Sequence, residues 1–190
     1  MRALCIATSW LLLTITISIA HAQTTASTLR LVKDESSVTY HLVHPLHKIE
    51  ATSKDVEYRV DADVATKTIK KVLAAVDVTT FSSGNSNRDS HAMEVIDGIT
   101  YPDARFVSLS VIRNGDSITV HGNLTFHGVT KEVVMNGTAN WSDGKLIVKG
   151  GFDTSLSAFN IDRPSLLLIP VEDSLSFEIV AVFQLVPVTQ

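Results

Sequence analysis

The sequence predicts an all-β domain, an antiparallel barrel of about eight strands with one short helix. Apolar and polar residues alternate with a period of two along most of the chain. Asn114-Gly115 and Asp143-Gly144 are typical of the short turns that join hairpin strands. Helical spacing of apolar residues is limited to about residues 87–97.

The alternation defines the expected strands in chain order. The last is the clearest, because Leu175, Phe177, Ile179 and Phe183 share one face. A sheet of this kind has unpaired edges, which closure into a barrel removes. An interior of about eight strands is either packed solid or holds one small ligand, and alternation does not decide between these. The expected strands lie at about residues 38–42, 56–62, 72–78, 106–112, 118–126, 133–141, 146–152 and 175–185.

The predicted helix, residues 87–97, has signals at both ends. Residues 85–87 are N-cap types, and Asp89 follows Ser86 at capping-box spacing. Gly98 is placed to terminate the helix, and Tyr101-Pro102 forces extended geometry before the next strand.

The N-terminus has the pattern of a secretory signal peptide. Arg2 precedes a short apolar run that ends in Ala20-His21-Ala22. We expect cleavage after Ala22, which divides the chain into a signal peptide (1–22) and one domain (23–190); the alternative is an uncleaved membrane anchor. The protein is then exported, with the periplasm as the expected compartment. Because the single cysteine, Cys5, precedes the cleavage point, no disulfide is expected.

Composition and motifs exclude several functional classes. The net charge is −4 and no basic run is present, so nucleic acid is not an expected partner. The sequence contains no G-x-S-x-G, P-loop or G-x-G-x-x-G motif and no cysteine nucleophile in the expected domain. We therefore do not expect an enzyme.

A histidine cluster offers an alternative function. His41, His44 and His47 are types that bind metal ions, and three such ligands can hold Zn²⁺ with a water. In a regular strand His44 would face away from the other two, so only a turn at Pro45 would gather them. The favoured interpretation is a polar strand end and turn without metal.

Three ordered motifs resemble the YceI-like family. They are Arg88-Asp89-Ser90-His91 followed by Tyr101-Pro102 and Phe106; residues 124–131, which end in Gly-Val-Thr-Lys; and Phe159-Asn160-Ile161 with Arg163-Pro164-Ser165. The resemblance covers about residues 29–186. A short His91–Tyr101 segment and the unusual residues 44–50 place the chain in a divergent branch.

The resemblance implies a lipocalin-like barrel of an exported protein that binds a long lipophilic chain. The expected ligand is a polyisoprenoid, quinone or fatty-acid-like chain, held for transport or sequestration without another cofactor. The alternative to an open lumen is a filled barrel that acts as an interaction module. The residues expected to line the tunnel are Val38, Tyr40, Leu42, Val76, Val78, Met93, Ile96, Phe106, Leu124, Phe126, Met135, Trp141, Phe152, Phe159, Phe177, Ile179 and Phe183.

Two segments have two interpretations each. Arg88, Asp89 and His91 either orient a polar headgroup at a barrel opening or serve as helix-capping and surface residues. The apolar run Leu166–Pro170 packs in the core or, as the less favoured reading, forms a lip that contacts a membrane transiently during lipid loading. The oligomeric state stays open, with a dimer among the states that the sequence permits.

Overall fold

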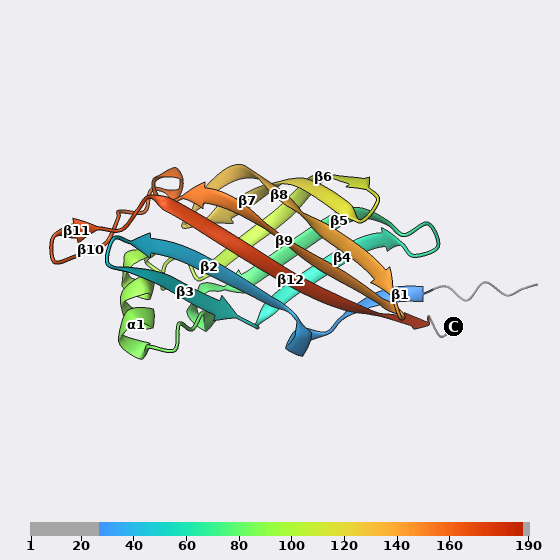
Figure 1. Cartoon of the computed structure of the whole chain (residues 1–190), viewed down its shortest axis with the longest axis horizontal. Helices are drawn as coiled ribbons and strands as arrows, with labels where there is room; N and C mark the ends of the chain where they lie inside the picture. The colour runs from blue at the N-terminus through green and yellow to red at the C-terminus, as the bar shows by residue number, and fades with distance from the viewer. Residues whose placement is uncertain (1–26, 188–190) are drawn as a thin grey trace, which may run out of the picture.

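The structure, a computed structural model, describes residues 27–187 and consists mainly of long strands, with one α-helix at one end of the molecule (Figure 1). The α-helix is α1 (Ser86–Val95), and single turns of 3₁₀ helix are η1 (Lys33–Glu35), η2 (Val78–Thr80) and η3 (Ser157–Phe159). The strands are β1 (Ser27–Leu31), β2 (Ser37–His44), β3 (His47–Ser53), β4 (Val56–Asp63), β5 (Thr68–Asp77), β6 (Asp103–Asn114), β7 (Ser117–Phe126), β8 (Val129–Ser142), β9 (Lys145–Ser155), β10 (Ser165–Leu166), β11 (Ile169–Pro170) and β12 (Ser174–Pro187).

One antiparallel sheet of ten strands forms the body of the protein. Its order is β3-β2-β12-β9-β8-β7-β6-β5-β4, and β1 pairs with the far end of β12. Both β1 and β2 pair with β12, and Ser36 lies between them in the chain. Ser36 is only 1% exposed, and its Oγ accepts a hydrogen bond from Val182 N of β12 at 3.0 Å. Figure 1 shows the long strands curling around a common axis. The predicted all-β class with one short helix is confirmed.

The sheet is a curled half-barrel rather than a hydrogen-bonded ring. Within residues 27–187, no ladder joins the end strands β3 and β4. Instead, Thr52 on β3 exchanges two backbone hydrogen bonds with Ser82, of 3.0 and 3.1 Å. Beside them, Ser53 Oγ and Thr80 Oγ1 lie 2.6 Å apart. The segment after β5 thus links to the free edge of β3.

The sheet has ten strands where about eight were expected, because β1 and β3 were not predicted. The β2–β3 turn contains Pro45 and Leu46, and His44 pairs with His47 across it. The proline marks a tight turn and not the end of the sheet. A period-two signal was present in β3, where Ala51 and Ser53 are buried and Thr52 between them is less so.

The helix α1 is close to the predicted position, but its ends differ in detail. Asn85 is the N-cap, and its side chain accepts from Arg88 N at 3.1 Å. Asp89 does not complete a capping box. At the C-terminus Asp97 takes the left-handed conformation with φ 44°. Gly98 N then donates to Met93 O at 2.9 Å, which completes a Schellman motif. Gly98 therefore lies one position further beyond the end of the helix than the prediction placed it.

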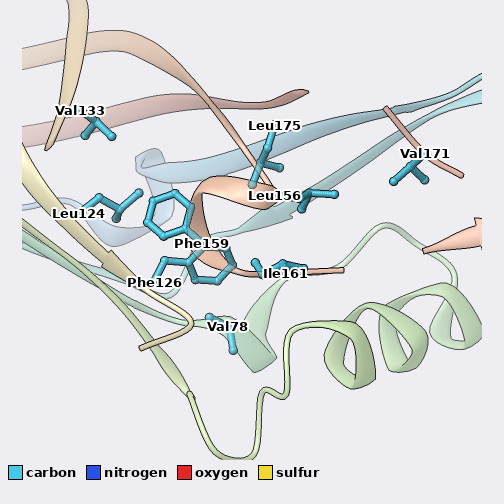
Figure 2. Close-up of a cluster of buried hydrophobic side chains, with 9 residues drawn as sticks. All are labelled: Val78, Leu124, Phe126, Val133, Leu156, Phe159, Ile161, Val171 and Leu175. Carbon is cyan, nitrogen blue, oxygen red and sulfur yellow. The ribbon is translucent and has the colours of Figure 1, made fainter. Parts of the chain in front are cut away.

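The core consists of two clusters within the curled sheet. One is centred on Phe159, which is 0% exposed and packs against Phe126 with ring centroids 5.5 Å apart (Figure 2). Phe159 comes from η3, so this cluster joins the sheet to the segment before β10. The second cluster surrounds Leu146 and Phe183 toward the other end of the sheet.

The run Leu166–Pro170 is not core, contrary to the favoured prediction. It forms the small β10–β11 hairpin, a separate two-stranded sheet. Leu167 and Leu168 at its turn are 77% and 96% exposed. Figure 1 shows this hairpin at the same end of the molecule as α1, beyond the ends of the long strands.

Candidate functional site

A first cavity of about 110 Å³ lies inside the curled sheet. Among the described residues that line it, only Tyr58 carries a side-chain oxygen or nitrogen. The lining comes from β2, β4–β9 and β12: Val38, Val56, Tyr58, Val60, Ile69, Val72, Ala74, Ala75, Val76, Ala104, Phe106, Val111, Ile118, Val120, Leu124, Phe126, Met135, Val148, Phe152, Phe177, Ile179, Ala181 and Phe183.

A second cavity of about 150 Å³ lies between the sheet and α1. Unlike the first, it has polar side chains in its wall, at Tyr40, Arg88, Asp89 and His91. Its full lining is Tyr40, Leu42, Ile49, Val76, Val78, Phe81, Arg88, Asp89, His91, Ala92, Met93, Val95, Ile96, Ala104, Phe126, Leu156, Pro164, Leu175 and Phe177.

The two cavities meet at a waist formed by Val76, Ala104, Phe126 and Phe177, which line both. The ring of the buried Phe159 contacts the ring of Phe126 and holds it in place. Phe177 is less buried and stacks on Phe152 with ring centroids 5.0 Å apart. The interior is therefore an apolar passage that is closed midway by this constriction of aromatic and small side chains and has a polar end beside α1.

The period-two pattern of β7 explains how the sequence builds this passage. Ile118, Val120, Leu124 and Phe126 are buried, while the residues between them are partly exposed. Gly122 occupies an inward position too, and a Cβ there would lie 2.3 Å from Phe106 Cζ. A Cβ at Gly98 would likewise lie 1.9 Å from Met93 Cε. These two glycines leave room for Phe106 and Met93, which line the cavities.

Ser82 and Ser83 hold the charged pair at the polar end. Asp89 accepts from Ser83 N at 3.0 Å and from Ser82 Oγ at 3.3 Å, and Ser83 Oγ also donates to it. The hydrogen bond from the Ser83 hydroxyl is the main cause that lowers the pKa of Asp89. Arg88 Nε and Nη2 donate to Ser83 Oγ and O at 2.8 and 3.1 Å. Both residues thus order the loop before α1 while lining the second cavity.

Tyr40 is the neutral polar group of this end. Desolvation by burial, with repulsion from Asp89, raises the pKa of its hydroxyl above the ordinary value of 10.0, and Arg88 opposes the shift. The phenol therefore keeps its proton at neutral pH and can donate a hydrogen bond. His91 also lines the second cavity, but it is exposed and lies 3.6 Å from Glu94.

The structure places most residues that were predicted to line a tunnel along the two cavities. Trp141 and Phe159 are exceptions. Phe159 packs behind Phe126 and not beside open space. Trp141 lies on the inward face of β8, but beyond the first cavity, where it packs against the second core cluster. Its Nε1 is buried and has no hydrogen-bond partner among the described residues.

Some cavity residues were not predicted. Val56, Tyr58 and Val60 follow the same alternation on β4 and were detectable. Phe81 and Pro164 lie outside the long strands, so period-two alternation gives no signal for them.

The three histidines do not form a metal site. His44 is buried; Leu46 N donates to its Nδ1 at 3.2 Å, and its Nε2 bonds to Ile169 O at 3.0 Å. His41 lies 3.4 Å from Glu50 and 3.8 Å from Glu178 on β3 and β12. Among residues 27–187, no group of three or more His, Cys, Asp or Glu side chains is placed to hold a metal ion. The metal alternative therefore has no ligand set in this part of the chain.

Two further observations concern membranes and the lumen. In the part of the chain that the structure describes, no helix has the length and apolar character needed to cross a bilayer. The interior is not packed solid, because it contains two cavities.

Comparison with known proteins agrees with this architecture. Residues 29–183 match the YceI-like domain family. A UPF0312 protein of Pseudomonas savastanoi pv. phaseolicola is 29% identical over 139 residues, which cover 68% of this chain and 72% of the relative. Protein YceI of Escherichia coli O157:H7 is 31% identical over 101 residues, so the match covers 52% of this chain and about half (49%) of that relative.

Solved structures share the fold. Burkholderia cenocepacia BcnA superposes with a TM-score of 0.72 at 22% identity, covering 80% of this chain and 99% of BcnA. A domain from Saccharophagus degradans, described as polyisoprenoid binding, gives 0.59 at 11% identity and covers 84% and 98%. The sequence match over nearly all of the described strands, together with this shared fold, shows that the chain belongs to the YceI-like family.

Proposed function

We propose that this protein is an exported binding protein that holds a long lipophilic ligand inside the half-barrel, for transport or sequestration. The main observation behind this proposal is the pair of apolar cavities that meet at Val76, Ala104, Phe126 and Phe177. The polyisoprenoid-binding description of the Saccharophagus degradans domain supports a polyisoprenoid, quinone or similar chain as the ligand. The proposed role is binding and not catalysis.

Burial of hydrocarbon supplies the affinity in this proposal. Each CH₂ removed from water contributes about 0.8 kcal/mol, so a five-carbon isoprene unit contributes roughly 3–4 kcal/mol before ordering costs. A dry cavity of about 150 Å³ accommodates a molecule the size of benzene. Each cavity therefore suits a short part of a chain, and a longer chain must pass the waist.

Phe177 is the side chain that we expect to move at the waist. It stacks on Phe152, whereas Phe126 is held by the fully buried Phe159. Rotation of Phe177, which lies at the partly buried margin of the Phe159 cluster, would join the two cavities while Phe126 keeps its contact with Phe159. The ligand tail would then occupy the first cavity, and its polar group would lie in the second, near Tyr40 and Arg88.

Export to the periplasm belongs to the same proposal and rests on the sequence of residues 1–22, which lie outside the described residues. The full chain, expressed in a Gram-negative host, should be recovered from the periplasmic fraction. N-terminal sequencing should begin at Gln23. Recovery of the uncleaved chain in the membrane fraction would instead support the anchor.

Filling the waist tests the binding proposal. Ala104→Phe places a ring between the cavities, whereas Val107→Phe adds the same ring on the outer face of β6, where Val107 is 41% exposed. Binding of a fluorescent farnesol derivative should weaken at least tenfold in Ala104→Phe and stay unchanged in Val107→Phe. Thermal unfolding of both variants checks that they are folded. Equal affinity in a folded Ala104→Phe would contradict binding in the lumen.

A further inference from the structure

The turn of the β10–β11 hairpin consists of two leucines that packing within the domain does not require. Leu167 and Leu168 form its turn with φ values of 54° and 66°, a conformation that favours Asn-Gly and is strained for leucine. They are also 77% and 96% exposed, so no burial within the described chain offsets the strain. Strain kept at an exposed turn indicates a role outside the folding of the domain.

The hairpin is held firmly at its base. His44 Nε2 bonds to Ile169 O at 3.0 Å, and Val171 N donates to Pro164 O at 2.9 Å. Arg163 Nε donates to Val171 O at 2.7 Å. His44 is only 2% exposed, which makes it an internal support. The leucines therefore project from a braced hairpin.

Leu46 extends this apolar surface. It lies in the β2–β3 turn and is 61% exposed. Its backbone N donates to Nδ1 of the same His44 ring whose Nε2 bonds to Ile169 O, so one imidazole joins the β2–β3 turn to strand β11 of the hairpin. We call Leu46 and Leu166–Ile169 the apolar tip.

The apolar tip lies beside the second cavity. Pro164, directly before β10, lines that cavity, as do Leu42 and Ile49 on the two strands that lead to and from the Leu46 turn. Figure 1 places the β10–β11 hairpin and α1 at the same end of the molecule. A surface that covered the tip would therefore meet the polar end of the passage.

The shape and charge of the tip fit a lipid bilayer. Consecutive leucines at the apex of a turn make a convex apolar projection, which fluid acyl chains accept without a preformed pocket. No charged residue lies between Arg163 and Glu172. Arg163 and Lys48, which are exposed, lie near the apolar tip in sequence but outside it, and Asp162 and Glu172 balance their charge.

We propose that the apolar tip inserts into the surface of a lipid bilayer and holds the second cavity against the membrane, so that ligand passes between bilayer and lumen without crossing water. This inference rests on the proposed function. It assigns the membrane contact to five residues outside the cavity walls, which allows docking and ligand binding to be tested separately.

A turn replacement provides the test. Leu167→Asn with Leu168→Gly suits the left-handed turn better and removes both apex side chains. The matched control is Leu109→Asn with Ile112→Gly, at positions on the outer face of β6 that are 61% and 58% exposed. Vesicles of phosphatidylethanolamine and phosphatidylglycerol that carry a fluorescent farnesol derivative serve as the probe, and the protein is the mature chain.

The turn variant should co-sediment with vesicles at least tenfold less than the unmodified protein and take up the probe at least tenfold more slowly. The control should keep both properties, and the turn variant should still bind the probe from detergent. Equal co-sedimentation of the turn variant and the unmodified protein would overturn the proposal. So would dimerisation of the unmodified protein, measured without vesicles by analytical ultracentrifugation, if the turn variant abolished it. Failure of all proteins to bind the probe in detergent would count against the proposed function, while co-sedimentation would still report on the tip.

Discussion

The ring of Phe106 on β6 occupies the space inside the half-barrel that a side chain at Gly122 on β7 would otherwise fill. A Cβ at position 122 would lie 2.3 Å from Phe106 Cζ and 2.7 Å from the carbonyl oxygen of Val107. The aromatic ring can rotate away, but the backbone carbonyl cannot move without disturbing the β6–β7 ladder. The absence of a side chain at one position thus sets the place of a ring that lines the first cavity.

Gly122→Ala is therefore expected to destabilise the protein by about 1–3 kcal/mol, the usual cost of overpacking a core. Urea unfolding, followed by circular dichroism, measures the change. Asn123→Ala on the same strand, at a less buried position, should change stability by less than about 0.5 kcal/mol. A Gly122→Ala variant as stable as the unmodified protein would show that this part of the lumen is not tightly packed.

Tyr58 carries a buried hydroxyl. Its oxygen has no hydrogen-bond partner among the described residues, although the ring lines the first cavity. Because an unsatisfied buried hydroxyl is unfavourable by roughly 1–3 kcal/mol, Tyr58→Phe should stabilise the fold by about 1 kcal/mol. Chemical unfolding at neutral pH tests this, and a loss of stability would indicate that the hydroxyl is hydrogen-bonded.

The same residue predicts a dependence of stability on alkaline pH. Burial raises the pKa of Tyr58 above its ordinary value of 10.0, so the folded state keeps a proton that the unfolded state loses. This contribution is fully present below pH 10 and decreases as the pH rises above it toward the folded pKa. Stability should therefore fall less steeply above pH 10 in Tyr58→Phe than in the unmodified protein. Parallel pH profiles for the two proteins would contradict the assignment.

His44 should be a structural residue and not a metal ligand. His44→Ala leaves Leu46 N and Ile169 O without their side-chain partner, which should reduce stability by about 1–3 kcal/mol. His41→Ala, on the outer face between two glutamates, should have a much smaller effect. Thermal unfolding with and without zinc completes the test: a large zinc-dependent increase in Tm that both variants lose would restore the metal alternative.

The apex of the β10–β11 hairpin predicts a gain of stability. Leucine in the left-handed conformation is unfavourable by about 1–2 kcal/mol per residue. Because asparagine relieves only part of this cost and glycine loses more conformational entropy on folding, Leu167→Asn with Leu168→Gly should raise the free energy of unfolding by about 1–2 kcal/mol in total. Urea unfolding of the two proteins in the absence of vesicles measures it. A decrease in stability would mean that the two leucines contribute to packing within the domain.

Sequence periodicity predicted the long strands and α1 well, because each long strand has one face toward the interior. It did not predict β3, although the turn at Pro45 was expected, since Ile49 and Ala51 are the only apolar residues of that strand. It also placed Trp141 in the tunnel, because periodicity reports the face of a strand and not the depth along the barrel axis. Whether an inward residue faces open space depends on neighbours such as Leu146, which pairs with Trp141 from another strand.

Loop residues were the least predictable part of the site. Leu166–Pro170 resembled core by hydropathy, and only the structure shows these side chains on an exposed hairpin. Ser82 and Ser83, which hold Arg88 and Asp89, gave no signal because serine is common in loops. Long-range contacts of this type, such as that between His44 and Ile169, follow from the assembled fold and not from local pattern.

A crystal structure of residues 23–190 with a bound long-chain polyprenol tests the central claim most directly. We predict continuous hydrocarbon density through both cavities, with Phe177 rotated away from Phe152 and the polyprenol hydroxyl beside Tyr40. Density for the chain only on the outer surface of the sheet, with Val76, Ala104, Phe126 and Phe177 still closing the waist, would contradict the account.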